Sequence, residues 1–280
     1  MELTIARLEP DALLEAEGVY HHSYSALHTY ASICSLQYRL KYIDRLPQER
    51  IGATLVFGSA MHEALHAIDS ELVKGRSPQA KQSFQVLRSY LEKAYGNRDV
   101  PVVSTQGDGL EDLYGEGVRL LEYYLSVLPP DEVPLELPRS FKVPLFDVGG
   151  EALPRPLRGE LDRWVRLKDG RVGVDDWKTT DKRWSDRKVK QDDQATAYFL
   201  GGESILARKP DFFRYALILK TKKPAVERMP AVRTEVHARR FVRKVKELDR
   251  AIKSGIFLPN DESFACPTCP FRNVCEKWQD

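Results

Sequence analysis

The sequence of 280 residues predicts an α/β protein, and three observations support this class. Residues 24–130 repeat apolar positions at helical spacing, and residues 139–180 alternate or cluster β-branched and aromatic residues. Residues 189–255 then return to helix, strand and helix before a cysteine-rich tail. The composition, 42% hydrophobic and 30% charged, is that of an ordinary soluble globular protein, and the length suits one elaborated domain.

The first third is predicted to be helical. Residues 24–43, YSALHTYASICSLQYRLKYI, form one long helix by their apolar and aromatic spacing, and residues 57–75 and 82–96 form two helices that each end in glycine. Residues 98–110 are typical of a loop. Residues 111–130 form a further amphipathic helix that two prolines end.

The middle of the chain is predicted to form a small antiparallel meander of strands within residues 139–148, 156–167 and 170–180. Lys168, Asp169 and Gly170 supply the turn between the last two strands. After the meander we expect a helix over 189–202, a strand over 212–221, a strand-like segment near 232–238 and a basic helix over 239–255.

The charge of the chain is nearly balanced, because the formal net charge is only +2. Cations are concentrated in residues 182–190 and 239–250, which is compatible with a phosphate-contacting surface and equally with solvated helix faces. No stretch approaches the roughly 20 apolar residues that span a bilayer, and the N-terminus lacks an export signal. We therefore expect a cytoplasmic protein without membrane contact, in which disulfides are disfavoured.

Residues His62-Glu63-Ala64-Leu65-His66 match the H-E-x-x-H pattern of zinc peptidases, in which two histidines one helical turn apart bind the metal. That function needs a third zinc ligand downstream. Glu92 and Glu111 can be nominated, but neither lies in a recognisable motif. A zinc peptidase would also leave the acidic residues of the meander and the cysteines without a role.

Asp176 and Lys178 are two residues apart on a predicted strand, so their side chains share one face while Trp177 faces the other way. If the hairpin pairs the neighbouring strands, Asp162 joins the same face. Two carboxylates beside a lysine suit Mg²⁺ or Mn²⁺, which prefer hard oxygen ligands. The alternative is an exposed strand end that carries an Asp-Lys ion pair.

The order of the motifs distinguishes these alternatives. A helix with Gly58 and His62 precedes G-x-x-D ending at Asp162, D-x-K from Asp176 to Lys178 and Q-x-x-x-Y from Gln194 to Tyr198. This ordered set resembles the RecB-like branch of the PD-(D/E)xK nuclease superfamily, from about Tyr24 to the C-terminus. The resemblance implies a restriction-endonuclease-like α/β core, in which helices flank a mixed central sheet.

The resemblance also implies a role for each motif. His62, Asp162 and Asp176 are expected to bind Mg²⁺ or Mn²⁺, with the carbonyl of Trp177 as a further ligand. Lys178 is expected to orient or activate the attacking water and to offset charge on the scissile phosphate. The remaining pair, Gln194 and Tyr198, is expected to contact the substrate and support the site, although a half-buried helix flank would have the same spacing. His66 is then a polar neighbour or a partly buried packing residue.

The four cysteines are arranged as one plus three, with Cys34 in the first predicted helix and Cys266, Cys269 and Cys275 in the tail. Buried apolar cysteines, a zinc site, two disulfides and a cubane cluster are the alternatives. The arrangement resembles that of the iron–sulfur RecB-like nucleases, which include the AddB subunit and CRISPR-associated adaptation nucleases. That resemblance implies a [4Fe–4S] cluster of mainly structural role.

Together the resemblances imply a helical N-terminal region over 1–135, a nuclease core over 136–255 and an iron–sulfur segment over 256–280. The implied activity is a metal-dependent deoxyribonuclease, an exonuclease acting on single-stranded DNA or DNA ends. Repair, recombination, phage DNA processing and CRISPR adaptation are the implied settings, with a helicase as a partner because the chain lacks a phosphate-binding helicase loop.

By the same resemblance, the helix over 24–43 would form part of a lid over the site, with Tyr24 and Ser25 near its start. Arg39 and Lys41 are candidate phosphate contacts on it. The alternative from another functional class is a non-catalytic iron–sulfur module that binds nucleic acid.

Overall fold

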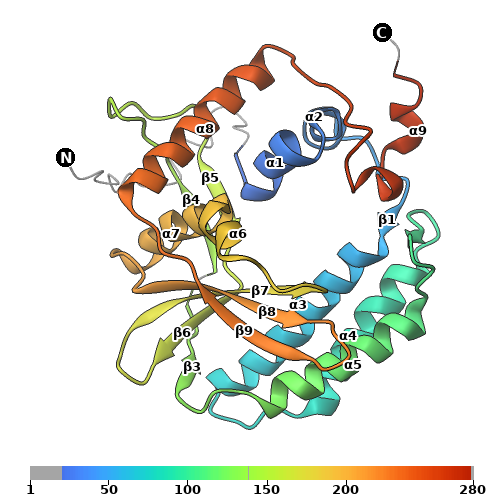
Figure 1. Ribbon diagram of the computed structural model, residues 1–280, viewed down its shortest axis with the longest axis vertical. Coiled ribbons are helices and arrows are strands. Elements are labelled where there is room, and N and C mark those ends of the chain that lie inside the picture. The colour runs from blue at the N-terminus through green and yellow to red at the C-terminus, as the bar shows by residue number, and fades with distance from the viewer. Residues whose placement is uncertain (1–20, 138, 279–280) are drawn as a thin grey trace.

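The computed structural model describes residues 21–137 and 139–278, and its centre is a five-stranded mixed sheet (Figure 1). The order of its strands is β3-β6-β7-β8-β9. Their bounds are Glu132–Pro134 for β3, Arg163–Leu167 for β6, Val172–Thr180 for β7, Phe212–Leu219 for β8 and Ala225–Pro230 for β9. The N-terminal stretch, in which we predicted no export signal, lies outside the described residues. No helix of the described segments is long and apolar enough to cross a membrane.

The central strand β7 pairs in two directions. It is antiparallel to β6, with Arg163 opposite Asp175, and parallel to β8, with Asp176 opposite Tyr215. The predicted hairpin through Asp169 is therefore confirmed. A parallel pair requires a crossover connection, and two helices, α6 (Asp186–Gln191) and α7 (Asp193–Leu206), supply it between β7 and β8.

The predicted antiparallel meander over residues 139–180 is only partly right. The segment 156–167 divides into β5 (Leu157–Glu160) and β6, because Leu161 and Asp162 leave the ladder between them. Strand β5 pairs antiparallel with β4 (Ser140–Val143) in a separate two-stranded sheet, whereas β6 joins the five-stranded sheet. The break brings Asp162 to the junction of the two sheets.

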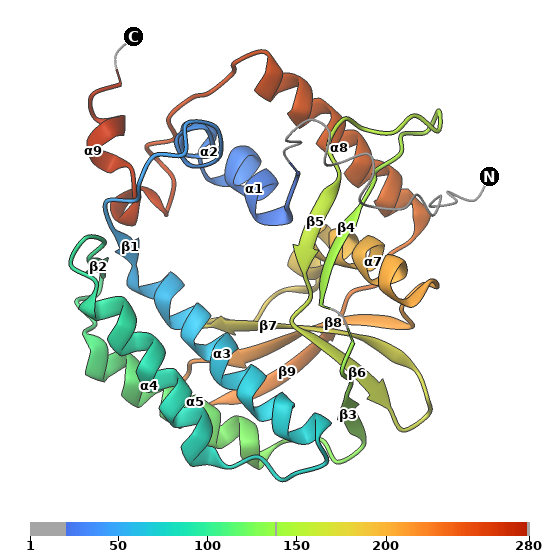
Figure 2. The ribbon, with the colours of Figure 1, turned by 180° about the vertical axis from the view of Figure 1, so that it is seen from behind.

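Helices cover both faces of the central sheet (Figures 1 and 2). On one face lie α3 (Ala53–Val73), α4 (Ala80–Gly96) and α5 (Leu110–Ser126), which share a buried core with Trp177, Ala216 and Ile218 of the sheet. On the other face, Val174, Tyr215 and Leu217 belong to a second core with α7 and with α8 (Glu235–Lys253). Alternate residues of β7 and β8 therefore enter opposite cores, as the two-residue period of a strand requires.

The predicted helix over 24–43 is broken into short helical segments. They are α1 (Tyr24–His28), the π-helical η1 (Thr29–Ile33), α2 (Ser35–Tyr38) and the π-helical η2 (Arg39–Ile43). Cys34 interrupts them with an extended backbone, at φ −168° and ψ 120°, and its sulfur accepts a hydrogen bond from the Gln37 N–H. Helical spacing in the sequence did not reveal this interruption.

The strand-like segment expected near 232–238 is wrong. Strand β9 ends at Pro230, and α8 begins at Glu235 after Thr234, which forms a reciprocal cap with His237. A threonine that caps a helix has the extended backbone of a strand, so β-branched residues around a cap imitate a strand pattern. The basic helix predicted over 239–255 is α8, which begins four residues earlier and ends two residues earlier than expected.

The C-terminal tail returns to the N-terminal helices (Figures 1 and 2). It contains the 3-10 helix η3 (Cys266–Thr268) and α9 (Arg272–Cys275). Asn260 donates a side-chain hydrogen bond to the Ile33 carbonyl at 2.8 Å, and Leu258 accepts one from the Leu36 N–H at 3.1 Å. The short parallel pair β1 (Ile51–Gly52) and β2 (Val102–Val103) lies between this region and α3.

Candidate active site

The D-x-K pair lies on β7, at its buried middle. Asp176 is fully buried, and its Oδ2 lies 2.5 Å from the Nζ of Lys178, whose side chain is 26% exposed. Trp177 points to the opposite face, where it enters the core beneath α3. The predicted alternation is therefore confirmed, and the two residues form a buried ion pair rather than the exposed pair of the alternative reading.

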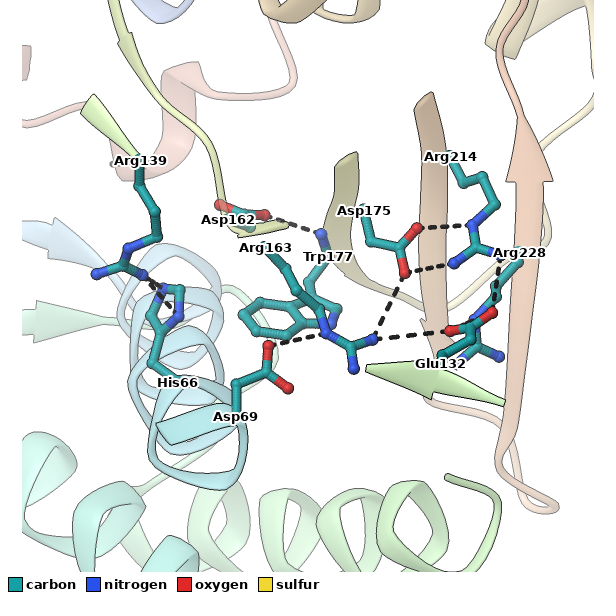
Figure 3. Close-up of polar contacts among 10 residues, drawn as sticks. All are labelled: His66, Asp69, Glu132, Arg139, Asp162, Arg163, Asp175, Trp177, Arg214 and Arg228. Carbon is teal, nitrogen blue, oxygen red and sulfur yellow. Dashed lines mark hydrogen bonds and ion pairs between the residues drawn. The ribbon is translucent and has the colours of Figure 1, made fainter. Parts of the chain in front are cut away.

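Asp162 and His62 converge on the backbone of Trp177. The Oδ2 of Asp162 accepts a hydrogen bond from the Trp177 N–H at 2.8 Å (Figure 3). The His62 Nε2 lies 3.0 Å from the Trp177 carbonyl oxygen, and its Nδ1 lies 3.5 Å from the Oδ1 of Asp162. Residues separated by a hundred positions thus gather at one point because α3 packs against the middle of β7.

The polar residues of this point influence one another's protonation. Burial raises the pKa of Asp176 to about 7, against the opposing charge of Lys178. Burial also opposes ionisation of Asp162, but the hydrogen bond and charge of His62, the charge of Lys178 and the Trp177 N–H together hold the pKa of Asp162 below its usual value. Burial lowers the pKa of His62, but the hydrogen bond and charge of Asp162 and the charge of Asp176 together raise it above its usual value. One carboxyl of the site is therefore held ionised while the other lies near its titration point at neutral pH.

The helix after β7 supports Asp176. Gln194, at the start of α7, donates its side-chain N–H to the Asp176 Oδ1 at 2.9 Å. Tyr198, one turn further, contacts Gln194 through its hydroxyl, and burial raises its pKa strongly. The Tyr198 ring packs edge-on against Phe141 at a centroid distance of 6.1 Å. Gln194 thus contacts a predicted ligand directly, whereas Tyr198 is a partly buried support behind it.

His66 has a different environment from His62. Its ring lies edge-on to Trp177 at 5.0 Å, and the Arg139 Nη1 lies 2.6 Å from its Nε2 (Figure 3). Burial, together with Arg139, lowers the pKa of His66 to about 4, so the ring is neutral at neutral pH. Glu63 is exposed. The H-E-x-x-H residues therefore do not face a common metal site.

The acids nominated for the peptidase are also engaged elsewhere. Glu92 and Glu111 both form ion pairs with Arg88, at 2.8 Å and 2.7 Å, on the outer helices α4 and α5. The zinc peptidase hypothesis therefore has no third ligand from the residues that we nominated for it.

Whether His62, Asp162 and Asp176 can bind a divalent cation depends on which of their donor atoms are available. Within residues 21–137 and 139–278, no group of three or more His, Cys, Asp or Glu side chains is arranged to hold a metal ion. The carboxylates are instead turned to Lys178 and to the Trp177 N–H. The Oδ2 of Asp176 is buried and, apart from its ion pair with Lys178, has no hydrogen-bond partner among the described residues, so a cation could take it as a ligand in place of the ammonium. Hard oxygen donors of this kind suit Mg²⁺ or Mn²⁺, and the assignment of individual ligands stays a prediction.

The four cysteines surround one cavity of about 290 Å³ between the N-terminal helices and the tail. All four are free and partly exposed. Burial raises the pKa of Cys269 and of Cys275, and the neighbouring thiols raise both further. The one-plus-three spacing in the sequence thus corresponds to one location in space, without an observed cluster.

A larger cavity of about 1040 Å³ lies among α1, α6, α7 and α8. Its lining includes five cations, namely Arg187, Lys188, Arg240, Arg243 and Lys244. The two basic runs of the sequence therefore face one space. At its edge the Tyr24 hydroxyl donates to the Asp192 Oδ1 at 2.8 Å, and Asp192 lies close enough to Lys178 to raise the pKa of that lysine, although the adjacent Asp176 contributes more.

Sequence reasoning missed Asp192 and Arg139, since neither belongs to a motif. The two predicted phosphate contacts lie elsewhere. Arg39 forms an ion pair with Asp44 at 3.2 Å, and Lys41 lies 5.1 Å from the centroid of the Tyr42 ring. Neither lines the larger cavity.

Comparison with known proteins gives one family. Residues 21–276 match the family model described as the PD-(D/E)XK nuclease superfamily. No curated protein matches the chain. Among solved structures, a candidate exonuclease from Eubacterium rectale is similar at 14% identity and a TM-score of 0.51, over 93% of this chain and 88% of that chain. The structure of SSO0001 aligns at 12% identity over 91% of this chain and 96% of that chain, with a TM-score of 0.34 that supports no conclusion.

Proposed function

The chain belongs to the PD-(D/E)XK nuclease superfamily, and from this premise we propose that it is a divalent-metal-dependent deoxyribonuclease of the RecB-like branch. The observation that carries the proposal is the convergence of His62, Asp162, Asp176 and Lys178 at the middle of β7. Burying charged groups costs free energy even when they are paired, so this cluster suits a catalytic site better than a packing role.

Members of this superfamily use divalent metals such as Mg²⁺ or Mn²⁺. In this chain His62, Asp162, Asp176 and the Trp177 carbonyl would hold the ion. When bound, it supplies a Lewis acid for the scissile phosphate and lowers the pKa of a water molecule. Asp176 is the residue most dependent on the cation, because burial raises its pKa to about 7 even with Lys178 beside it.

The protein's own groups supply the remaining parts of the chemistry. Lys178 keeps its proton, since Asp176 raises its pKa, and so offers a fixed positive charge toward a pentacoordinate phosphate. Gln194 fixes the orientation of the Asp176 carboxylate through its hydrogen bond at 2.9 Å. Oxygen donors and a cation held before substrate arrives are the preorganised arrangement that phosphodiester hydrolysis requires.

The substrate class that we propose is single-stranded DNA or a DNA end. The larger cavity supports this choice, because it combines cations with the aromatic ring of Tyr24 beside the site. Phosphates interact with such cations and bases stack on aromatic rings without regard to sequence. Action from a strand end, a helicase partner and a setting in repair, recombination, phage DNA processing or CRISPR adaptation belong to the same proposal.

We propose further that Cys34, Cys266, Cys269 and Cys275 hold a [4Fe–4S] cluster. The cavity that all four line supports this assignment, because four thiolates are the usual ligands of a cubane cluster. Such a cluster would join the tail to the helices around Cys34, which already share backbone hydrogen bonds. Its role would be structural.

Cleavage assays test the nuclease proposal. Purified protein is incubated with linear single-stranded, circular single-stranded and duplex DNA in Mg²⁺, in Mn²⁺ and in chelator, beside Lys178→Ala. Exposed Lys168, on the β6–β7 turn and 81% exposed, gives the matched control Lys168→Ala. We expect metal-dependent cleavage of linear single strands that only Lys178→Ala abolishes. Equal cleavage by Lys178→Ala and wild type would refute the assignment, and DNA binding without cleavage by the wild type would favour the non-catalytic binding module.

A further inference from the structure

A buried ion network crosses the central sheet (Figure 3). It includes Asp175 and therefore lies on the face of β7 opposite the side chain of Asp176, because successive residues of a strand point to opposite faces. It consists of three acids and three arginines from six different elements, namely Asp69 of α3, Glu132 of β3, Arg163 of β6, Asp175 of β7, Arg214 of β8 and Arg228 of β9. Asp175 is fully buried, and Arg163 is 3% exposed. No motif of the sequence indicated this network.

Arg163 lies at the centre of the network. Its Nε is 2.8 Å from the Asp69 Oδ2, and its Nη1 is 3.5 Å from the Asp175 Oδ2. Arg214 binds Asp175 with two nitrogens, at 2.7 Å and 2.8 Å, and donates to the Glu132 Oε1 at 2.8 Å. The paired, planar contact of Arg214 with Asp175 resists rotation and so fixes β7 against β8, while Arg163 adds ion pairs to Asp69 and Asp175.

Two members of the network are chain neighbours of the proposed metal ligands. Arg163 directly follows Asp162, and Asp175 directly precedes Asp176. Arg163 and Asp175 also face each other in the register of β6 and β7. Since successive side chains of a strand point to opposite faces, a contact that holds Asp175 from one face also sets the position of Asp176 on the other.

Stability alone is a weak reason for such a network. Burying ions costs free energy, and well-packed apolar residues of similar volume often stabilise a core as well or better. Among the described residues, four buried atoms of the network have no hydrogen-bond partner, so it is not fully satisfied; they are the Asp69 Oδ1, the Glu132 Oε2, the Arg163 Nε and the Arg228 Nε. Its directional contacts supply a geometric constraint that apolar packing would not.

We propose that Arg163 and Asp175 are positioning residues, which act through the buried ion network to fix the separation and orientation of Asp162 and Asp176 for a divalent cation. The inference rests on the proposed function, because it assigns the network to the metal site of that nuclease. Asp69 is part of the same device, since it joins Arg163 to α3, the helix that carries His62.

The test uses Asp69→Asn as the mild variant and Asp175→Asn as the strong one. Each keeps side-chain volume and removes one charge from the network. Asp169→Asn, on the exposed β6–β7 turn, is the matched control, since its carboxylate is 53% exposed and pairs only locally with Arg171. Calorimetry measures Mn²⁺ binding, thermal unfolding reports stability, and cleavage is titrated with Mg²⁺. Hydrogen exchange of the Trp177 amide, which donates to Asp162, reports the geometry without metal.

We expect Asp69→Asn to stay folded, to bind Mn²⁺ about tenfold more weakly or worse, and to exchange the Trp177 amide faster. DNA binding in chelator should be unchanged, as should every property of Asp169→Asn. If Asp69→Asn and Asp175→Asn only lower the melting temperature and leave Mn²⁺ binding unchanged, the positioning role is wrong.

The proposed nuclease function is tested separately from the positioning role. It is refuted if the wild type shows no metal-dependent cleavage. Trp177 exchange then still decides the positioning role, because an unchanged exchange rate in Asp69→Asn would overturn it.

Discussion

Replacing Lys178 by methionine removes the one side-chain cation that lies within 4 Å of Asp176 among the described residues. The methionine keeps the unbranched length of the lysine stem without its charge. Asp176 then remains fully buried, with its Oδ2 facing an apolar group in place of an ammonium at 2.5 Å. An uncompensated buried carboxylate is unfavourable, so the metal-free protein must lose stability.

The expected loss of stability follows from the surroundings of Lys178 and of Asp176. Breaking a buried ion pair costs about 3–5 kcal/mol, and we expect the lower end of this range. Lys178 is 26% exposed, and Asp176 keeps the hydrogen bond from Gln194 at 2.9 Å. A loss of about 3 kcal/mol corresponds to a fall of about 6 °C in melting temperature for a domain of this size.

The loss should also depend on pH. Because burial raises the folded-state pKa of Asp176 to about 7, above its ordinary value of 3.8, the folded state binds more protons between these values and stability falls as pH rises through them. Without Lys178 that pKa rises further. The destabilisation by Lys178→Met is therefore largest above pH 7 and smaller below it, where Asp176 takes up a proton.

A double-mutant cycle measures this interaction in chelator. Denaturant unfolding is compared for wild type, Lys178→Met, Asp176→Asn and the double variant. The double variant should recover most of the stability that Lys178→Met loses, because no charge remains buried, yet it should not cleave DNA. Additive losses in the cycle would refute the buried pair, and cleavage by Lys178→Met at the wild-type rate would refute the catalytic role of the lysine.

Three further outcomes follow from the structure. His62→Ala should impair metal-dependent cleavage by about tenfold more than His66→Ala, because only His62 contacts Asp162 and the Trp177 carbonyl. Anaerobically purified protein should be brown and contain iron, and Cys34→Ser should lose both iron and the packing of the tail. Acid should destabilise the fold by about 3 kcal/mol between pH 6.5 and about 4, because burial outweighs the nearby Asp249 and lowers the pKa of His22 to about 4.

The pH effect has a defined sign. A histidine whose folded-state pKa is depressed binds fewer protons when folded, so stability is present above pH 6.5 and is lost as pH falls toward 4. His22→Gln should flatten this dependence, and an equally steep acid transition in that variant would assign the transition to other groups.

Equal effects of His62→Ala and His66→Ala on cleavage would reopen the zinc peptidase hypothesis. A colourless protein that contains zinc would contradict the iron–sulfur assignment.

The local chemistry of the site was predictable from the sequence because it depends on short-range rules. Strand alternation around Trp177 correctly placed Asp176 and Lys178 on one face, and the Lys168-Asp169-Gly170 turn correctly paired β6 with β7. The predicted α/β class, with helices on both sides of a mixed central sheet, and the predicted nuclease superfamily are confirmed as well. The ligand roles, the cluster and the division into three segments stay predictions.

Long-range features were not predictable in the same way. The division of residues 156–167 between two sheets depends on partners from distant segments, and a strand pattern does not specify its partner. The break at Cys34 depends on backbone contacts with the tail around Leu258, which helical periodicity does not encode. In the sequence, the arginines and acids of the buried ion network resemble surface residues, because charged residues are usually exposed.

The two faces of β7 show why the unpredicted buried ion network matters for the site. One face carries Asp176 and Lys178 toward the site, and the other carries Asp175 toward Arg163 and Arg214. An apolar residue in place of Asp175 would pack well on its face of β7, but it would not hold the strand through directional contacts. The neighbouring Asp176 could then shift, and a shift of about 1 Å is enough to impair a catalytic site. Charge on both faces of one strand is therefore the arrangement expected when a metal site must be stiff before its cation arrives.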